Sequence, residues 1–226
     1  MKKIFMQIVR YVGIVSILAF VASCDKNEDD GNNNNSGVAN EYAESYIPYY
    51  VEPDSLVLNG MWYDSVPGVG IRVEGKTIYQ NHNSDKIQYE ALAKKYGDVG
   101  FNRKAAIGRD GAISVAIDSI SVISDVDVDA SHPKGAELSD IVKLYSKNYY
   151  TYIKSGYKDE IAESDGEHYK FISEYTKEDF SLMYCQRGLE FHFDSTVVVS
   201  ETYNLTITIY FENGKKLSTT QAINFN

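Results

Sequence analysis

The stretch of this chain whose residue types best fit chemistry is Glu-Phe-His-Phe-Asp at residues 190–194. Successive side chains of an extended strand point to opposite faces, so Glu190, His192 and Asp194 would share one face. Carboxylate and imidazole groups at this spacing can ligate a metal ion or form an acid–base pair. Any half-buried strand alternates in the same way, so ordinary strand packing stays open as the alternative.

An acidic string, Asp-Val-Asp-Val-Asp, is the second candidate, with carboxylates at Asp125, Asp127 and Asp129. Carboxylate oxygens are ligands that Ca²⁺ prefers, so calcium is the one cofactor that the sequence suggests. Neither the glycine nor the distal glutamate of an EF-hand loop is in register. The alternative is a solvated strand face or turn, in which case the chain needs no cofactor.

Tyrosines are a third candidate, because the chain contains 19 of them. Four that lie close together can form an exposed aromatic platform that stacks on sugars or contacts a protein. These four are Tyr149, Tyr150, Tyr152 and Tyr157. Tyrosine is also an ordinary strand residue, so packing within the fold is the alternative. The sequence has no HExxH, GxSxG, GxGxxG or P-loop motif and no paired-cysteine zinc spacing.

The chain begins with a basic segment and an apolar run from Tyr11 to Val21, which is typical of a secretory signal peptide. A membrane-spanning helix needs about 20 apolar residues, so this run is too short to span. Val-Ala-Ser-Cys at residues 21–24 resembles a bacterial lipobox. The resemblance implies cleavage before Cys24, lipidation of its sulfur and anchoring to a membrane through the acyl chains. An ordinary secreted protein is the alternative.

The net charge argues against a nucleic-acid partner, and the cysteine content argues against a disulfide framework. Removal of the signal peptide, residues 1–23, takes 3 of the 22 basic residues and none of the 32 acidic ones, which leaves a net charge of −13. A protein this acidic is repelled by nucleic acid, so we expect no nucleic-acid partner. Cys185 is the only cysteine besides Cys24, which excludes a disulfide framework and favours a small buried side chain at Cys185.

Residues 24–40 are expected to be the lipidated cysteine followed by a disordered, asparagine-rich tether. The acidic cluster at residues 28–30 resembles the signal with which Bacteroidota export lipoproteins to the outer face of the outer membrane. This resemblance implies a lipid-anchored outer-membrane protein that faces the cell exterior. Solvated linker charge is the alternative.

Four Asp-Ser triplets that end in an apolar residue or threonine resemble the O-glycosylation sequon of the same phylum. The resemblance implies possible glycans on Ser55, Ser65, Ser119 and Ser195. Turns and strand edges also favour Asp-Ser pairs, so the motifs have a purely structural alternative.

The elements that must position these residues are mostly strands. We expect a helix over residues 84–96 that ends at Gly97, and a long hairpin over 202–224 whose Asn213-Gly214 pair adopts a type I′ turn. We also expect a tight hairpin at Glu74-Gly75.

Further along, the pattern predicts a short helix over residues 139–147, a strand over 149–153 and a short helix that opens with a capping box at Thr176–Asp179. Residues 41–226 are therefore expected to form a single mostly β or α+β globular domain. We expect an antiparallel β-sandwich, with an immunoglobulin-like form as one option, decorated with two or three short helices.

Segments 99–101, 120–125, 132–135 and 138–141 resemble a group of uncharacterised Bacteroidota surface lipoproteins that are defined as a domain of unknown function. The resemblance covers much of residues 40–226. It implies location and type of organism, and it supplies no catalytic residue.

Taken together, these patterns favour a non-enzymatic binding module for a glycan or a protein on the cell surface. An extracellular hydrolase that uses Glu190, His192 and Asp194 is the alternative. A structural or assembly accessory of a surface complex is the second alternative.

Overall fold

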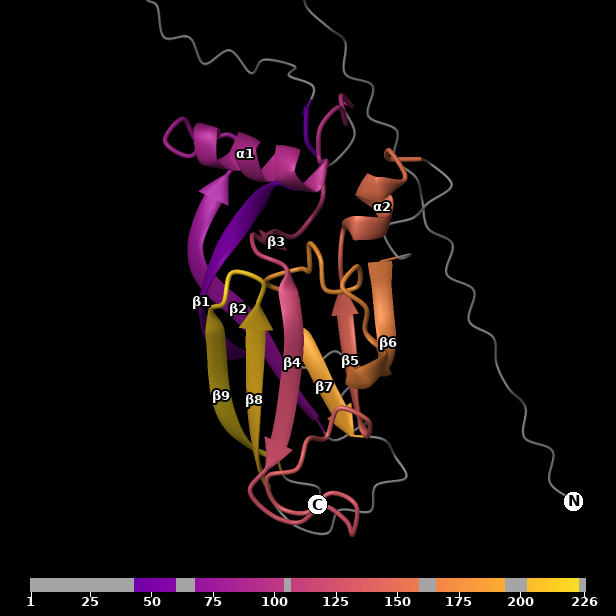
Figure 1. Cartoon of the computed structure of the whole chain (residues 1–226). Helices are drawn as coiled ribbons and strands as arrows, with labels where there is room; N and C mark the ends of the chain where they lie inside the picture. Colours follow the sequence, from indigo (N-terminus) through magenta and orange to yellow (C-terminus); the bar gives the residue numbers. More distant parts are fainter. Residues whose placement is uncertain (1–42, 60–67, 104–106, 159–165, 194–202, 224–226) are drawn as a thin grey trace, which may run out of the picture. The chain divides into compact units, whose positions relative to one another are not determined.

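The computed structural model describes residues 43–59, 68–103, 107–158, 166–193 and 203–223 (Figure 1). All of them belong to one compact unit, Ala39–Asn226. The predicted signal peptide and tether lie outside the described residues.

The described strands form two sheets. The larger sheet has the order β3-β1-β2-β7-β5-β6, and its strands are β1 (Tyr49–Asn59), β2 (Gly68–Tyr79), β3 (Ala112–Ile113), β5 (Val142–Lys147), β6 (Glu167–Phe171) and β7 (Leu189–Phe193). The smaller sheet has the order β4-β8-β9, and its strands are β4 (Ile117–Ser124), β8 (Tyr203–Phe211) and β9 (Lys216–Ile223). The predicted β-rich, sandwich-like fold is confirmed.

In the part of the chain that the structure describes, two short α-helices accompany the sheets, α1 (Lys86–Tyr96) and α2 (Tyr150–Lys154), with a 3₁₀ turn at Ile172–Glu174. Within the described ranges, no helix is both long and apolar enough to cross a bilayer. The strand pairs are antiparallel except for β1 and β3, which run parallel. This six-and-three division differs from the four-and-three arrangement of immunoglobulin constant domains.

The main core lies between the two sheets, because each contributes one apolar face. Ile71 and Phe191 come from the six-stranded sheet, and Ile207 and Ile209 from the three-stranded sheet, all fully or almost fully buried. Burial of each such side chain contributes about 1.5–3 kcal/mol. The opposite face of β8 is polar, with Thr206 and its neighbours, as the period-two pattern predicts.

A second core, which we call the tyrosine cluster, packs α1 and α2 against the start of β1. Its buried tyrosines are Tyr46, Tyr50, Tyr89, Tyr149, Tyr157 and Tyr184. The rings meet mainly edge to face, as in the pair Tyr46–Tyr149, whose centroids lie 5.6 Å apart. Much of the high tyrosine content therefore serves packing.

The predicted C-terminal hairpin is confirmed, but its turn type was wrong. β8 and β9 pair from Tyr210↔Lys216 to Tyr203↔Ile223. Of the Asn213-Gly214 pair only Gly214 has a positive φ, 83°, and its N–H donates to the Phe211 carbonyl. A type I turn followed by a left-handed glycine also suits a right-twisted hairpin, so the longer loop is equally compatible with this sequence.

The predicted hairpin at Glu74-Gly75 was wrong, because β2 runs through it as one strand. Gly75 lies opposite a β-bulge of β1, where pairing shifts between Pro53 and Ser55. A Cβ at Gly75 would lie 1.8 Å from the carbonyl oxygen of Glu52. The glycine permits close backbone approach at the bulge and does not make a turn.

Both predictions for residues 139–153 were wrong, because a strand forms where we expected a helix and a helix forms where we expected a strand. The predicted helix is strand β5, in which Val142, Leu144 and Ser146 are buried and the residues between them are partly exposed. The predicted strand is α2. Apolar residues at 141, 142, 144 and 145 fit a helical stripe as well as a strand, and pairing of β5 with both β6 and β7 decides between them.

The predicted helix at 84–96 is confirmed as α1, and Gly97 ends it with φ 78°. The capping box at Thr176 and Asp179 forms, since the two residues exchange backbone-to-side-chain hydrogen bonds. The chain continues from it as turns and bends without an α-helix.

Candidate functional site

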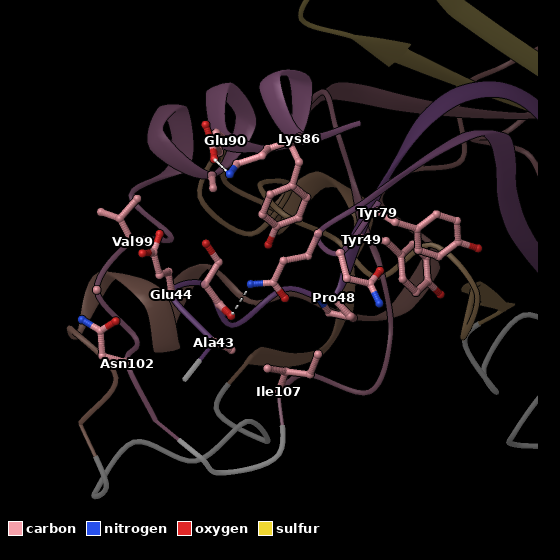
Figure 2. Close-up of a pocket in the computed structure, with 16 residues that line it drawn as sticks. Ala43, Glu44, Pro48, Tyr49, Tyr79, Lys86, Glu90, Val99, Asn102 and Ile107 are labelled. Carbon is pink, nitrogen blue, oxygen red and sulfur yellow. Dashed lines mark hydrogen bonds and ion pairs between the residues drawn. The ribbon is translucent and has the colours of Figure 1, made fainter. Parts of the chain in front are cut away.

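A groove of about 940 Å³ lies between α1, the segment before β1 and the loop after α1 (Figure 2). Residues 43–45, 48 and 49 form one wall, α1 contributes Lys86, Tyr89 and Glu90, and residues 99, 100, 102 and 107 close the remaining side. Tyr49 and Tyr79 lie at one end of the groove, and Val99 and Asn102 lie at the other. The groove therefore combines aromatic rings with polar side chains.

The aromatic end is built by strand pairing. Tyr49 of β1 and Tyr79 of β2 are direct partners in the antiparallel ladder, and their ring centroids lie 5.5 Å apart at 47°. Tyr79 remains 37% exposed, and its ring also contacts the imidazole of His82 at 4.4 Å. Two neighbouring rings on one groove are thus available to a ligand.

Polar side chains line the groove along its length. Glu44, Asn81 and Asn102 are exposed, and none of their side chains hydrogen-bonds to another described residue. Lys86 and Glu90, one turn apart on α1, form a loose ion pair of 3.9 Å. Amides both donate and accept hydrogen bonds, so this lining suits a ligand rich in hydroxyl groups.

Asp98, which is fully buried, holds the groove wall in place. Its carboxylate accepts hydrogen bonds from the N–H groups of Tyr46 (2.8 Å) and Ile47 (3.0 Å) and from the Tyr157 hydroxyl (2.8 Å). Burial raises the pKa of Asp98, and these three hydrogen bonds oppose the rise. Its own N–H donates to Ala93, so one residue joins the end of α1 to the opposite wall.

Asp110 and Gly111 fix the position of Tyr49. The Tyr49 hydroxyl donates to Asp110 Oδ1 at 3.3 Å, and the buried Asp110 also accepts from the N–H groups of Gly111 (2.7 Å) and Arg187 (2.9 Å). A Cβ at Gly111 would lie 2.0 Å from Cε2 of Tyr49. The ring packs directly on the glycine, so a larger residue there must displace it.

Of the three residues that the sequence suggested as metal ligands or an acid–base pair, the structure brings Glu190 and His192 together. Glu190 and His192 lie on β7 with His192 Nε2 3.3 Å from Glu190 Oε2, and both are fully buried. Burial lowers the pKa of His192, and the neighbouring Glu190 opposes this shift. Asp194 lies outside the described residues. Neither member of the buried pair lines the groove.

The three predicted calcium ligands each stabilise the loop that follows β4. Asp125 accepts from the backbone and side-chain nitrogens of Asn204, and Asp127 accepts from the N–H of Lys134 at 2.7 Å. Asp129 contacts His132. Within the described ranges, no group of three or more His, Cys, Asp or Glu residues could hold a metal ion. Calcium binding stays a prediction that no contact here supports.

His132 lies between two carboxylates, which makes loop stability depend on pH. Its Nδ1 is 2.9 Å from Asp129 Oδ1 and its Nε2 is 3.1 Å from Asp140 Oδ1. The hydrogen bond to Asp129 raises the pKa of His132 above 6.5, and Asp140 adds to the effect.

A raised folded-state pKa means that the stabilisation is complete below the unfolded pKa and is lost as pH rises through the folded value. We therefore expect part of the unfolding free energy of the wild type to be lost as the pH rises above 6.5. His132→Gln should lack this loss, and the exposed His82→Gln should keep it, in urea unfolding over a pH series. A wild-type loss that persists in His132→Gln would contradict the assignment.

The four predicted platform tyrosines lie in two environments. Tyr149 and Tyr157 are buried in the tyrosine cluster, whereas Tyr150 and Tyr152 on α2 are partly exposed. The Tyr149 hydroxyl donates to the Asp110 carbonyl at 2.7 Å and accepts from the Asp110 N–H at 3.0 Å. Tyr149 and Tyr157 thus support the groove through Asp110 and Asp98 and do not present their rings to solvent.

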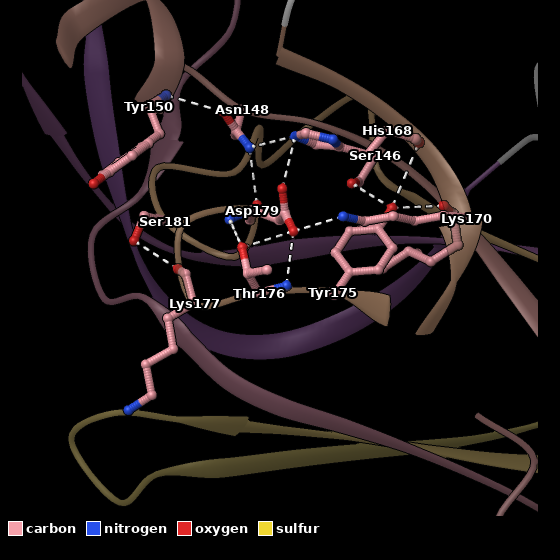
Figure 3. Close-up of polar contacts among 11 residues, drawn as sticks. Ser146, Asn148, Tyr150, His168, Lys170, Tyr175, Thr176, Lys177, Asp179 and Ser181 are labelled. Atoms are coloured by element: carbon pink, nitrogen blue, oxygen red, sulfur yellow. Dashed lines mark hydrogen bonds and ion pairs between the residues drawn. The ribbon is translucent and has the colours of Figure 1, made fainter. Parts of the chain in front are cut away.

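A polar network on β5 and β6 fixes the tautomer of His168 (Figure 3). The Asn148 amide accepts from the Tyr150 N–H with Oδ1 (3.0 Å) and donates to the Asp179 carbonyl with Nδ2 (2.9 Å), which sets its orientation. The same Nδ2 lies 3.0 Å from His168 Nε2 and must donate to it. Nε2 is then unprotonated, and the neutral imidazole carries its proton on Nδ1.

Acid is expected to destabilise this network. Burial lowers the pKa of His168, and Lys170 lowers it further, while Asp179 opposes the shift. A lowered folded-state pKa gives stability that is present above the unfolded value of 6.5 and is lost as pH falls through the folded one.

The wild type should therefore lose stability as the pH falls below 6.5, and His168→Gln should lose less, in urea unfolding. His82→Gln is again the control. Parallel losses in the wild type and His168→Gln would contradict the assignment. The direction is opposite to that of His132, so the two variants separate the two effects.

Two of the four candidate glycosylation sites are described, and both share one local geometry. Asp54 and Asp118 are each the extra residue of a β-bulge, and the following Ser55 and Ser119 are exposed. Ser65 and Ser195 lie outside the described residues. Glycosylation stays a prediction, which the accessibility of these two hydroxyls permits.

Cys185 is fully buried, and burial raises the pKa of its thiol. Cys24 lies outside the described residues. Comparisons with protein-family models, with curated proteins and with solved structures find no significant match to this chain.

Proposed function

We propose that this chain is a lipid-anchored outer-membrane lipoprotein that faces the cell exterior and whose β-rich domain is a non-enzymatic binding module for a glycan. The location is supported by the signal sequence, the lipobox-like residues 21–24 and the acidic residues 28–30. The binding activity is supported by the groove.

One observation carries the binding proposal: the Tyr49–Tyr79 pair lies on a groove that is also lined by free amide and carboxylate side chains. The apolar faces of sugar rings pack on aromatic rings, and their hydroxyls bond to planar polar groups such as Asn81 and Asn102. The groove volume of about 940 Å³ lies within the range of small-molecule sites, and it suits a few sugar units.

The hydrolase alternative rested on Glu190, His192 and Asp194. The first two side chains are fully buried and do not line this groove, so they offer less support for catalysis than the exposed Tyr79 and its partner Tyr49 offer for binding. A protein ligand and an assembly role remain as outcomes of the test below.

Binding of the mature protein to a panel of immobilised glycans tests the proposal. Tyr79→Ala should weaken binding to a positive glycan about tenfold or more, because the stacking surface is lost. Tyr169→Ala removes a tyrosine that is 52% exposed on β6, away from the groove, and should bind as the wild type does. Equal affinity of Tyr79→Ala and the wild type would contradict the proposal, and so would binding to no glycan.

The intact mass of the native protein tests anchoring and glycosylation together. A mass equal to the polypeptide from residue 24 plus lipid supports the anchor and excludes glycans on Ser55 and Ser119. Further mass in units of hexose would support glycosylation. A mass equal to the unmodified polypeptide would contradict both.

A further inference from the structure

The groove lining carries more acidic than basic side chains. Its lining contains Glu44, Glu90 and Lys86, two acids and one base. Lys86 pairs with Glu90 at 3.9 Å, whereas the exposed Glu44 makes no ion pair within the part of the chain that the structure describes. One carboxylate in the groove is therefore uncompensated.

Glu44 lies on the groove wall beside Val99, on the side away from the tyrosine pair (Figure 2). A ligand that occupies the length of the groove would contact both the rings of Tyr49 and Tyr79 and this carboxylate. An ammonium group is attracted to a carboxylate by charge and to the face of a tyrosine ring by its quadrupole.

The net charge of the whole chain also favours a cationic ligand. The net charge is −10, or −13 for the chain without residues 1–23, so acidic polysaccharides are repelled as they approach and cationic ones are attracted. Uronate and sulfate groups would add repulsion from Glu44 within the groove itself.

We infer that the ligand of the groove is an oligosaccharide that carries free amino groups, with an ammonium beside Glu44 and a sugar face on Tyr79. This inference rests on the proposed function, because it names the class of glycan that the same groove prefers.

Three tetrasaccharides of matched length test it by calorimetry on the mature protein at mildly acidic pH and low salt. They are the chitosan tetramer, which is cationic, its fully N-acetylated counterpart, which is neutral, and a hyaluronan tetramer, which is anionic. The cationic tetramer should bind about two- to fivefold more tightly than the neutral one, as expected for an exposed charge pair. The anionic tetramer should bind most weakly, and high salt should reduce both differences.

Glu44→Gln should remove the preference, so that this variant binds the cationic and the neutral tetramers with equal affinity. Glu52→Gln replaces an exposed glutamate of β1 outside the groove and should keep the preference.

Equal affinities of the wild type for the cationic and neutral tetramers would overturn the inference and leave the glycan-binding function standing. A preference that persists in Glu44→Gln, or tighter binding of hyaluronan, would overturn it in the same way. If the protein binds none of the three tetramers, the inference is overturned. If it also binds no glycan of the panel, the proposed function is overturned as well.

Discussion

Replacement of Asp98 by alanine is expected to lower the free energy of unfolding by about 3–5 kcal/mol. The change leaves the buried N–H groups of Tyr46 and Ile47 and the hydroxyl of Tyr157 without their acceptor. Each unsatisfied buried donor costs about 1–3 kcal/mol. Urea unfolding measures the loss.

The chain offers a matched control and a graded variant for this prediction. Asp118→Ala removes an exposed aspartate whose ion pair with Lys177 is 3.9 Å long, and it should change stability by less than about 0.5 kcal/mol. Asp98→Asn keeps one acceptor oxygen and should fall between the two. A loss below about 1 kcal/mol for Asp98→Ala would show that Asp98 does not hold the groove wall.

Replacement of Gly111 by alanine is expected to displace Tyr49 and weaken glycan binding about tenfold, with a loss of about 1–3 kcal/mol in stability. The added Cβ would lie 2.0 Å from Cε2 of the ring. Tyr49 is only partly buried, so its ring can move, but it then leaves its partner Tyr79 and the carboxylate of Asp110. Calorimetric affinity and urea unfolding measure the two effects.

A double-mutant cycle separates displacement of the ring from damage to the backbone. In the Tyr49→Ala background the steric conflict is absent, so Gly111→Ala should change neither affinity nor stability by much. Additive effects of the two substitutions would contradict the direct contact between the glycine and the ring.

The fold class and two elements could be predicted from the sequence because their signals are local. Gly97 ends α1, and Asn213-Gly214 joins two strands of alternating polarity. Gly75 misled the prediction because the same residue type serves a turn and a close backbone approach. Only the pairing of β1 with β2 distinguishes these uses.

The groove could not be predicted from the sequence. Tyr49 and Tyr79 are 30 positions apart, and they become neighbours only through the register of β1 and β2. No spacing rule marks them among 19 tyrosines. By contrast, alternation correctly placed Glu190 and His192 on one face of a strand, but it could not reveal that the structure buries both.

The buried aspartates were missed for the same reason. Asp98 and Asp110 stand in loop-like sequence, where solvent exposure is the usual state of an aspartate. Several of their partners are backbone N–H groups more than 50 positions away, as in the bonds from Tyr46 to Asp98 and from Arg187 to Asp110. Long-range backbone contacts leave no pattern in the amino-acid sequence.

The most direct test of the central claim is a titration of the isotope-labelled mature protein with the N-acetylated and chitosan tetramers, followed through backbone amide chemical shifts. The account predicts that the largest shifts fall on Glu44, Tyr49, Tyr79, Asn81 and Asn102, with none at Tyr169 or on β7. Shifts that centre on β6 and β7, or shifts at no residue, would contradict a glycan-binding groove between α1 and the start of β1.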